Sequence, residues 1–191
     1  MSKRSPQPET AASLDRHARW YLERYTTARG HLRRLLLRRV NKSIFLFGGD
    51  RDEAAEWVDA VLDRLERRGT LDDLRFATDR ARSLHLRGTS TRQIRAKLAE
   101  KGVRPPIMDE ALAALDASQG DPDLRAACAY VRKRRLGPFR DDPSAHRERD
   151  LARLARAGFP YAVASKVLAL HDPAEVEAIE MGIDDLFGAP H

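Results

Sequence analysis

Apolar residues recur at the spacing of an α-helix along almost the whole chain, and no other feature limits the possible folds as strongly. After a polar N-terminus, one stripe contains Leu14, Ala18, Tyr21, Leu22 and Tyr25, and a second contains Leu32, Leu35, Leu36 and Val40. Residues three or four positions apart lie on one face of a helix, so each stripe predicts an amphipathic helix. We therefore expect an all-α protein.

The short apolar run at 44–47 is the one stretch that a β-strand could use. It reads Ile-Phe-Leu-Phe and is closed by Gly48 and Gly49, but no partner run is found elsewhere. A single strand without a partner leaves its backbone hydrogen bonds unmade. We expect this run to be a buried linker or a frayed helix end.

The order of helical stripes returns about every 60 residues. LRRLLLRRV at 32–40 aligns with IRAKLAEKG at 94–102, an offset of 62. LAEKGV at 98–103 aligns with LARAGF at 154–159, an offset of 56. Repeats of this length contact mainly their neighbours, so the pattern predicts tandem three-helix repeats that form an elongated, curved body.

The expected organisation follows these repeats and the composition of the two ends. The parts are a disordered N-terminus at 1–11, three-helix units at 12–68, 69–117 and 118–171, and an acidic C-terminal tail at 172–191. The tail segment 174–187 is amphipathic, with Val176, Ile179, Ile183 and Leu186 as its apolar residues. It either folds back onto a basic face of the protein or is a loose solvated end.

Two adjacent carboxylates, Asp72 and Asp73, raise the question of a catalytic pair. Neighbouring side chains on a helix point about 100° apart, so they are poorly placed to share a metal ion or a substrate atom. The pair follows Gly69, which suits a helix end, and precedes an apolar stripe. An acidic N-cap belongs at that position, because it accepts backbone N–H groups at the positive end of a helix.

No other pattern suggests catalysis, a cofactor or a metal. The six histidines are scattered and form no metal-binding motif, and no glycine-rich phosphate loop is present. Cys128 falls on an apolar stripe, which indicates a small core residue. A single cysteine excludes an internal disulfide, and no signal peptide or membrane-spanning run is evident. We expect a cytoplasmic protein that is not an enzyme and needs no cofactor.

Charge is unevenly distributed along the chain. Residues 1–50 have 11 Lys and Arg against 4 Asp and Glu, and residues 118–170 have 11 against 6. Residues 51–117 are balanced, and residues 171–191 have 6 acids and no Lys or Arg. Basic stretches attract phosphate backbones or acidic protein surfaces, although a solvated helix face is the alternative for any single arginine.

The cations of three clusters are candidate contact residues for DNA or for a protein partner. They are Arg33, Arg34, Arg38, Arg39 and Lys42, then Arg92, Arg95, Lys97 and Lys101, then Arg132, Lys133, Arg134 and Arg135. The second cluster lies in a helix-turn-helix pattern at 90–115. Asp109 and Glu110 stand where that motif would need base-reading side chains, which argues against sequence-specific reading of the major groove.

Four stretches of this sequence resemble the RecX family, whose members regulate the RecA recombinase. They are RRVNKSIFLFGGDRDEA at 38–54, GTLDDLRFA at 69–77, RGTSTRQIRAKLAEKGV at 87–103 and LARAGFPYAVASKVL at 154–168. The likeness spans about residues 12–170. One position departs from the family pattern, since Ala157 stands where an arginine usually precedes Gly158 and Phe159.

The resemblance implies tandem three-helix units and binding in the groove of the RecA–single-stranded DNA filament. Such a protein would restrain filament growth, ATP hydrolysis and strand exchange. The implied partners are the RecA filament and, through it, single-stranded DNA. We expect no membrane partner and a monomeric protein. The family motif residues are structural, so they do not identify contact residues. A sequence-nonspecific helical DNA-binding protein without a filament partner is the alternative.

Overall fold

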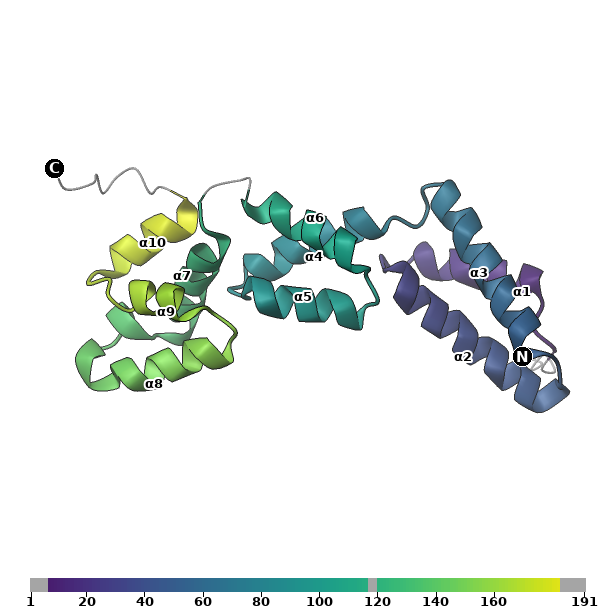
Figure 1. The fold of residues 1–191 in the computed structure, drawn as a ribbon, viewed down its shortest axis with the longest axis horizontal. Coiled ribbons are helices and arrows are strands. Elements are labelled where there is room, and N and C mark those ends of the chain that lie inside the picture. Colours follow the sequence, from purple (N-terminus) through teal and green to yellow (C-terminus); the bar gives the residue numbers. More distant parts are fainter. Residues whose placement is uncertain (1–6, 117–119, 183–191) are drawn as a thin grey trace, which may run out of the picture. The chain divides into compact units, whose positions relative to one another are not determined.

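A computed structural model describes residues 7–116 and 120–182, and among these residues it contains ten α-helices, one 3-10 helix and no strand (Figure 1). The prediction of an all-α fold is therefore confirmed. The helices are α1 (Ala11–Leu22), α2 (Arg29–Phe47), α3 (Arg51–Arg67), α4 (Asp73–His85), α5 (Thr91–Glu100), α6 (Pro105–Asp116), α7 (Pro122–Arg134), η1 (Gly137–Phe139), α8 (Pro143–Arg156), α9 (Tyr161–Val167) and α10 (Pro173–Met181). No helix in the described residues is long and apolar enough to cross a bilayer.

The chain divides into two compact units. The first contains residues up to 76 together with 101–104, and the second contains 77–100 together with residues from 105 onward. In the first unit, α1 and α2 both pack against α3. Their shared core is apolar and closed to solvent, and it contains Leu14, Ala18, Leu32, Leu36, Val40, Ala54, Val58, Val61, Leu62, Leu65 and Leu71.

The helix α2 continues through the apolar run at 44–47, which confirms a helix end there. The alternative of a buried linker is wrong, because Phe45 is 88% exposed, Leu46 52% and Phe47 45%. Val40 is buried and Ile44 packs at the edge of the core, four residues later on the same side of the helix. Phe45 follows Val40 by five positions, about 140° around the axis, which turns it away from that core.

The two adjacent aspartates act at two different helices. Asp72 accepts a hydrogen bond from the backbone N–H of Arg75 at 2.9 Å, so it caps α4 as predicted. Asp73 accepts one from the backbone N–H of Arg29 at 2.6 Å, which places its carboxylate at the start of α2. Their separate bonds leave no shared site, and the interpretation as helix caps is confirmed.

The start of α2 also lies against the loop between α5 and α6. A Cβ added to Gly30 would lie 2.5 Å from the carbonyl oxygen of Gly102. Gly102 itself has φ +78, a left-handed conformation that favours glycine and is typical of the residue that ends a helix such as α5. Pro105 and Pro106 then occupy the first turn of α6, where proline is well tolerated because its missing N–H would have no partner in the helix.

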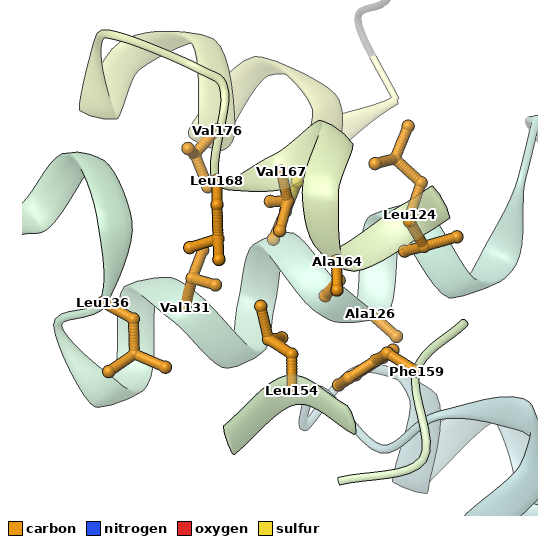
Figure 2. Packing of buried hydrophobic residues seen from close by; sticks show 13 residues of the cluster. Leu124, Ala126, Val131, Leu136, Leu154, Phe159, Ala164, Val167, Leu168 and Val176 are labelled. Atoms are coloured by element: carbon orange, nitrogen blue, oxygen red, sulfur yellow. The ribbon is translucent and has the colours of Figure 1, made fainter. Parts of the chain in front are cut away.

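The second unit is built around α7, which α9 and α10 contact (Figure 2). Cys128 lies in this core without solvent exposure, which confirms its prediction as a core residue. Val176 of α10 is also fully buried there, and Ile179 packs against the same cluster. The part of the acidic tail within α10 therefore folds back onto the protein, whereas Ile183 and Leu186 lie outside the described residues.

Candidate nucleic-acid interface

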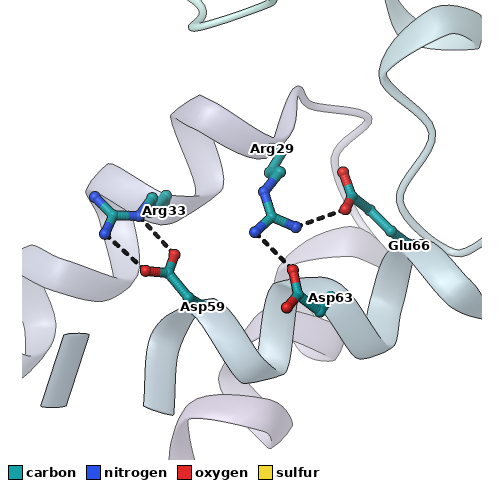
Figure 3. A network of polar contacts seen from close by, with 5 residues as sticks. All are labelled: Arg29, Arg33, Asp59, Asp63 and Glu66. Carbon is teal, nitrogen blue, oxygen red and sulfur yellow. Dashed lines mark hydrogen bonds and ion pairs between the residues drawn. The ribbon is translucent and has the colours of Figure 1, made fainter. Parts of the chain in front are cut away.

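The helix α2 has six Lys and Arg residues and no acidic residue, yet its neighbours neutralise several of these charges. Arg29 binds Asp63 at 2.8 Å and Glu66 at 2.6 Å (Figure 3). Arg33 donates two hydrogen bonds to Asp59, at 2.7 and 2.8 Å, and these bonds lower the pKa of that carboxyl group. The acids all belong to α3, so Arg33 is occupied within the protein.

Arg39 is occupied on the other flank of α2. Its guanidinium lies 2.6 Å from Oε1 of Glu9, and the backbone N–H of Glu9 donates to the Ser43 hydroxyl at 2.9 Å. The segment before α1 is therefore held against α2 by both a charge pair and a hydrogen bond. Arg39, like Arg33, contributes a neutralised pair to the surface rather than a free positive charge.

Three other cations of α2 lie on one exposed stripe. Arg34, Arg38 and Lys42 are four residues apart and all exposed, and the stripe ends at Phe45. Arg38 precedes Val40 by two positions, which turns it about 200° from that core residue. Arg38 and Lys42 form no ion pair within residues 7–116 and 120–182. We call Arg34, Arg38 and Lys42 the α2 basic face.

The positive field of this face extends toward the loop between α5 and α6. His31 lies at its start, and its pKa is lowered by burial and by the nearby charges of Lys101, Arg34 and Arg38. Lys101 therefore lies near the α2 basic face, although the sequence grouped it with the cations of α5. Neither Lys101 nor the exposed Arg104 that follows it forms an ion pair in the described part of the chain.

The predicted cluster on α5 is divided by its contacts. Arg95 binds Asp109 of α6 at 2.6 Å, so the acid that weakened the helix-turn-helix interpretation is paired with a cation of the first helix. Arg92 and Lys97 are exposed. Arg92 lies beside the turn after α8, because a Cβ added to Gly158 in that turn would be 3.7 Å from the Cβ of Arg92.

The third predicted cluster ends α7 and is partly covered by α10. Arg132 donates two hydrogen bonds of 2.7 Å to Glu180, which neutralises it. Arg134 lies 5.8 Å over the ring of Tyr130, and Arg135 caps the helix with φ +52. Lys133 is exposed. This cluster therefore presents fewer available charges than its sequence indicates.

Sequence reasoning missed Phe45 and Arg104 as surface groups beside the cations. For Phe45 a signal was present, because it follows Arg38 by seven residues and Lys42 by three, the spacing of one helix face. The apolar character of the run at 44–47 instead suggested a buried linker as one of the two alternatives. No group of three metal-binding side chains occurs in the described residues.

Comparison with known proteins gives a consistent result. The family model described as RecX, second three-helix domain, matches residues 72–112. A regulatory protein RecX from Myxococcus xanthus is 43% identical over 166 residues, covering 85% of this chain and 88% of the relative. One from Mycobacterium ulcerans is 34% identical over 172 residues, covering 89% and 94%. No solved structure matches. The chain belongs to the RecX family of regulatory proteins.

Proposed function

We propose that this protein regulates the RecA recombinase, mainly as an inhibitor. It binds in the groove of the RecA–single-stranded DNA filament and restrains filament growth, ATP hydrolysis and strand exchange. Membership of the RecX family supports the choice of RecA as partner. The α2 basic face supports the proposed mode of binding. Arg38 and Lys42 are exposed there and have no ion-pair partner in the described residues.

The α2 basic face suits a phosphate backbone or an acidic protein groove. Residues four positions apart on a helix are about 6 Å apart along its axis, so the face presents a row of regularly spaced charges. Each phosphate that such a cation neutralises releases condensed counterions, which favours binding at low salt. Binding one filament state more tightly than another then shifts the population toward that state. The protein needs no cofactor and no catalytic step for this action.

The first test is RecA ATP hydrolysis on single-stranded DNA with the protein added in substoichiometric amounts. We expect hydrolysis to fall at ratios too low to cover the DNA, because each bound molecule affects a filament rather than one site. If hydrolysis falls only when the DNA is saturated, competition for DNA explains the effect. That result would favour the alternative of a sequence-nonspecific DNA-binding protein without a filament partner.

Charge reversal tests whether the α2 basic face makes the contact. The double variant R38E/K42E should weaken inhibition strongly, since both side chains are exposed and unpaired in the described structure. A matched control is the double variant R149E/K166E, which changes net charge equally at exposed cations outside the three clusters. Equal loss in the two variants would assign the effect to net charge and contradict the choice of this face.

A further inference from the structure

The exposed aromatic ring at the end of α2 is not explained by packing. Phe45 is 88% exposed, the highest exposure of any large apolar side chain in the described residues. It follows Lys42 by three positions and Arg38 by seven, so the ring and the two charges share one face. Burying a phenylalanine rather than exposing it is worth roughly 1.5–3 kcal/mol, so this position is unfavourable unless a partner covers the ring.

We propose that Phe45 stacks on an unpaired base of single-stranded DNA while Arg38 and Lys42 bind the neighbouring phosphates. This deepens the proposed function, on which it rests, because it assigns a DNA contact to the same face. Binding sites for single strands combine a basic track with aromatic rings on which bases stack, and they tolerate any sequence because every base has a π-face. The end of α2 presents both elements in one line.

The arrangement favours a nucleic acid over an apolar pocket of a protein. The stripe contains no acidic residue, since α2 has none, and three acids of α3, Asp59, Asp63 and Glu66, bind Arg29 and Arg33 instead. An apolar protein pocket would need no aligned cations. A single strand needs both, because its phosphates and its bases alternate along one chain.

The interface also predicts which nucleic acid binds best. A base in a duplex is stacked on both sides, so its face is closed to Phe45 until the pair is opened, which costs several kcal/mol. The cations, in contrast, bind the phosphates of either form. Phe45 should therefore contribute to the affinity for single strands and not for duplexes.

The experiment measures the affinity of the full chain for a short mixed-sequence single strand, for the same length of abasic strand, and for a duplex. The variant F45A should lower affinity for the single strand by about 5- to 100-fold, the range expected for one stacked base. Affinities for the abasic strand and the duplex should not change. The variant L46A is the control, because Leu46 is also exposed but has no ring.

Two further variants separate stacking from simple apolar contact. F45W should bind the single strand as tightly as the unmodified protein, while F45L should lose as much affinity as F45A. If F45L binds normally, the ring is not needed, and the residue contacts an apolar surface instead. If F45A weakens single-strand and duplex binding equally, the stacking proposal is also overturned. Circular dichroism should show unchanged helicity and thermal midpoint for all four variants.

The outcome is distinguishable from failure of the proposed function. If F45A leaves DNA affinity unchanged but R38E/K42E abolishes inhibition of RecA, the regulatory proposal holds and the stacking proposal fails. If F45A lowers single-strand affinity but the protein never affects RecA at substoichiometric ratios, stacking holds and the filament proposal fails.

Discussion

The carboxylate of Asp73 accepts a hydrogen bond of 2.6 Å from the backbone N–H of Arg29, across 44 residues of sequence. Ala28, the residue at the N-cap of α2, has no side chain that can accept this bond. Asp73 therefore takes the role of the missing cap from another helix. The start of the helix that presents the α2 basic face depends on this contact.

Replacing Asp73 by alanine should lower the free energy of unfolding by about 1–2 kcal/mol, the usual cost of losing a helix cap. Asp73→Asn should cost less, because the amide oxygen still accepts from Arg29. Urea denaturation monitored by circular dichroism measures both changes. If the two variants are equally destabilised, the hydrogen bond is not what Asp73 contributes.

The same carboxyl group should make stability depend on pH. Burial raises the pKa of Asp73 above 3.8, against the opposing hydrogen bond from Arg29. A raised pKa means that the folded protein holds this proton more tightly than the unfolded chain does. The stabilisation that results is fully present below the pKa of the unfolded chain and is lost as the pH rises through the pKa of the folded protein. As the pH rises from about 3 to about 6, the unmodified protein should therefore lose free energy of unfolding relative to Asp73→Asn, which does not titrate at this position. A constant difference between variant and unmodified protein would contradict the shifted pKa.

Asp150 should show the opposite dependence. Burial alone would raise the pKa of this fully buried group, but hydrogen bonds from Arg140 and from the backbone N–H of Gly137 hold it below 3.8. Its stabilisation is present above the unfolded pKa and is lost as pH falls. Asp150→Ala should cost on the order of 3 kcal/mol near neutral pH, because it leaves Arg140 unpaired. The difference should shrink on acidification in the same denaturation experiments.

Gly30→Ala should destabilise the protein although alanine is the better helix former. The added Cβ would lie 2.5 Å from the Gly102 carbonyl oxygen, a backbone atom that cannot rotate away. Overpacking of this kind costs about 1–3 kcal/mol. Asn41→Ala is the control, an exposed site in the same helix where alanine should stabilise by a few tenths of a kcal/mol. Stabilisation by Gly30→Ala would show that the two glycines are not in close contact.

The salt dependence of DNA binding should distinguish free cations from paired ones. Arg38→Ala and Lys42→Ala should each reduce the slope of log affinity against log salt by about 1. Arg33→Ala should reduce it by much less, because Arg33 is bound to Asp59 in the free protein. Titrations at several salt concentrations measure the slopes. Equal reductions of the slope by Arg33→Ala and Arg38→Ala would contradict the distinction between a paired Arg33 and an unpaired Arg38.

Features that depend on neighbouring residues could be predicted from the sequence. Asp72 caps α4, Gly102 ends α5 and Pro105 begins α6, as the residue types indicate. Each depends on contacts within about one helical turn, so a short stretch of sequence contains the whole cause. The same local motifs carried the resemblance to the RecX family, which the relatives confirm.

Of the two alternatives for the run at 44–47, the helix end is confirmed and the buried linker is wrong, for a physical reason. Its apolarity predicts burial, but burial depends on which side of the helix faces a neighbour. Val40 lies in the core that α2 shares with α1 and α3, whereas Phe45 points away from it. Only the packing of three helices decides which side that is.

The sequence by itself determined that this chain is helical, where some of its helices begin or end, and which family it resembles. It also placed five cations together on one stretch of α2. Only the tertiary structure decided that Arg33 is bound by Asp59 and Arg39 by Glu9, while Arg38 and Lys42 stay exposed. The reason is that helical periodicity is a property of neighbouring residues, whereas a charge is neutralised by whichever carboxylate folding brings within reach.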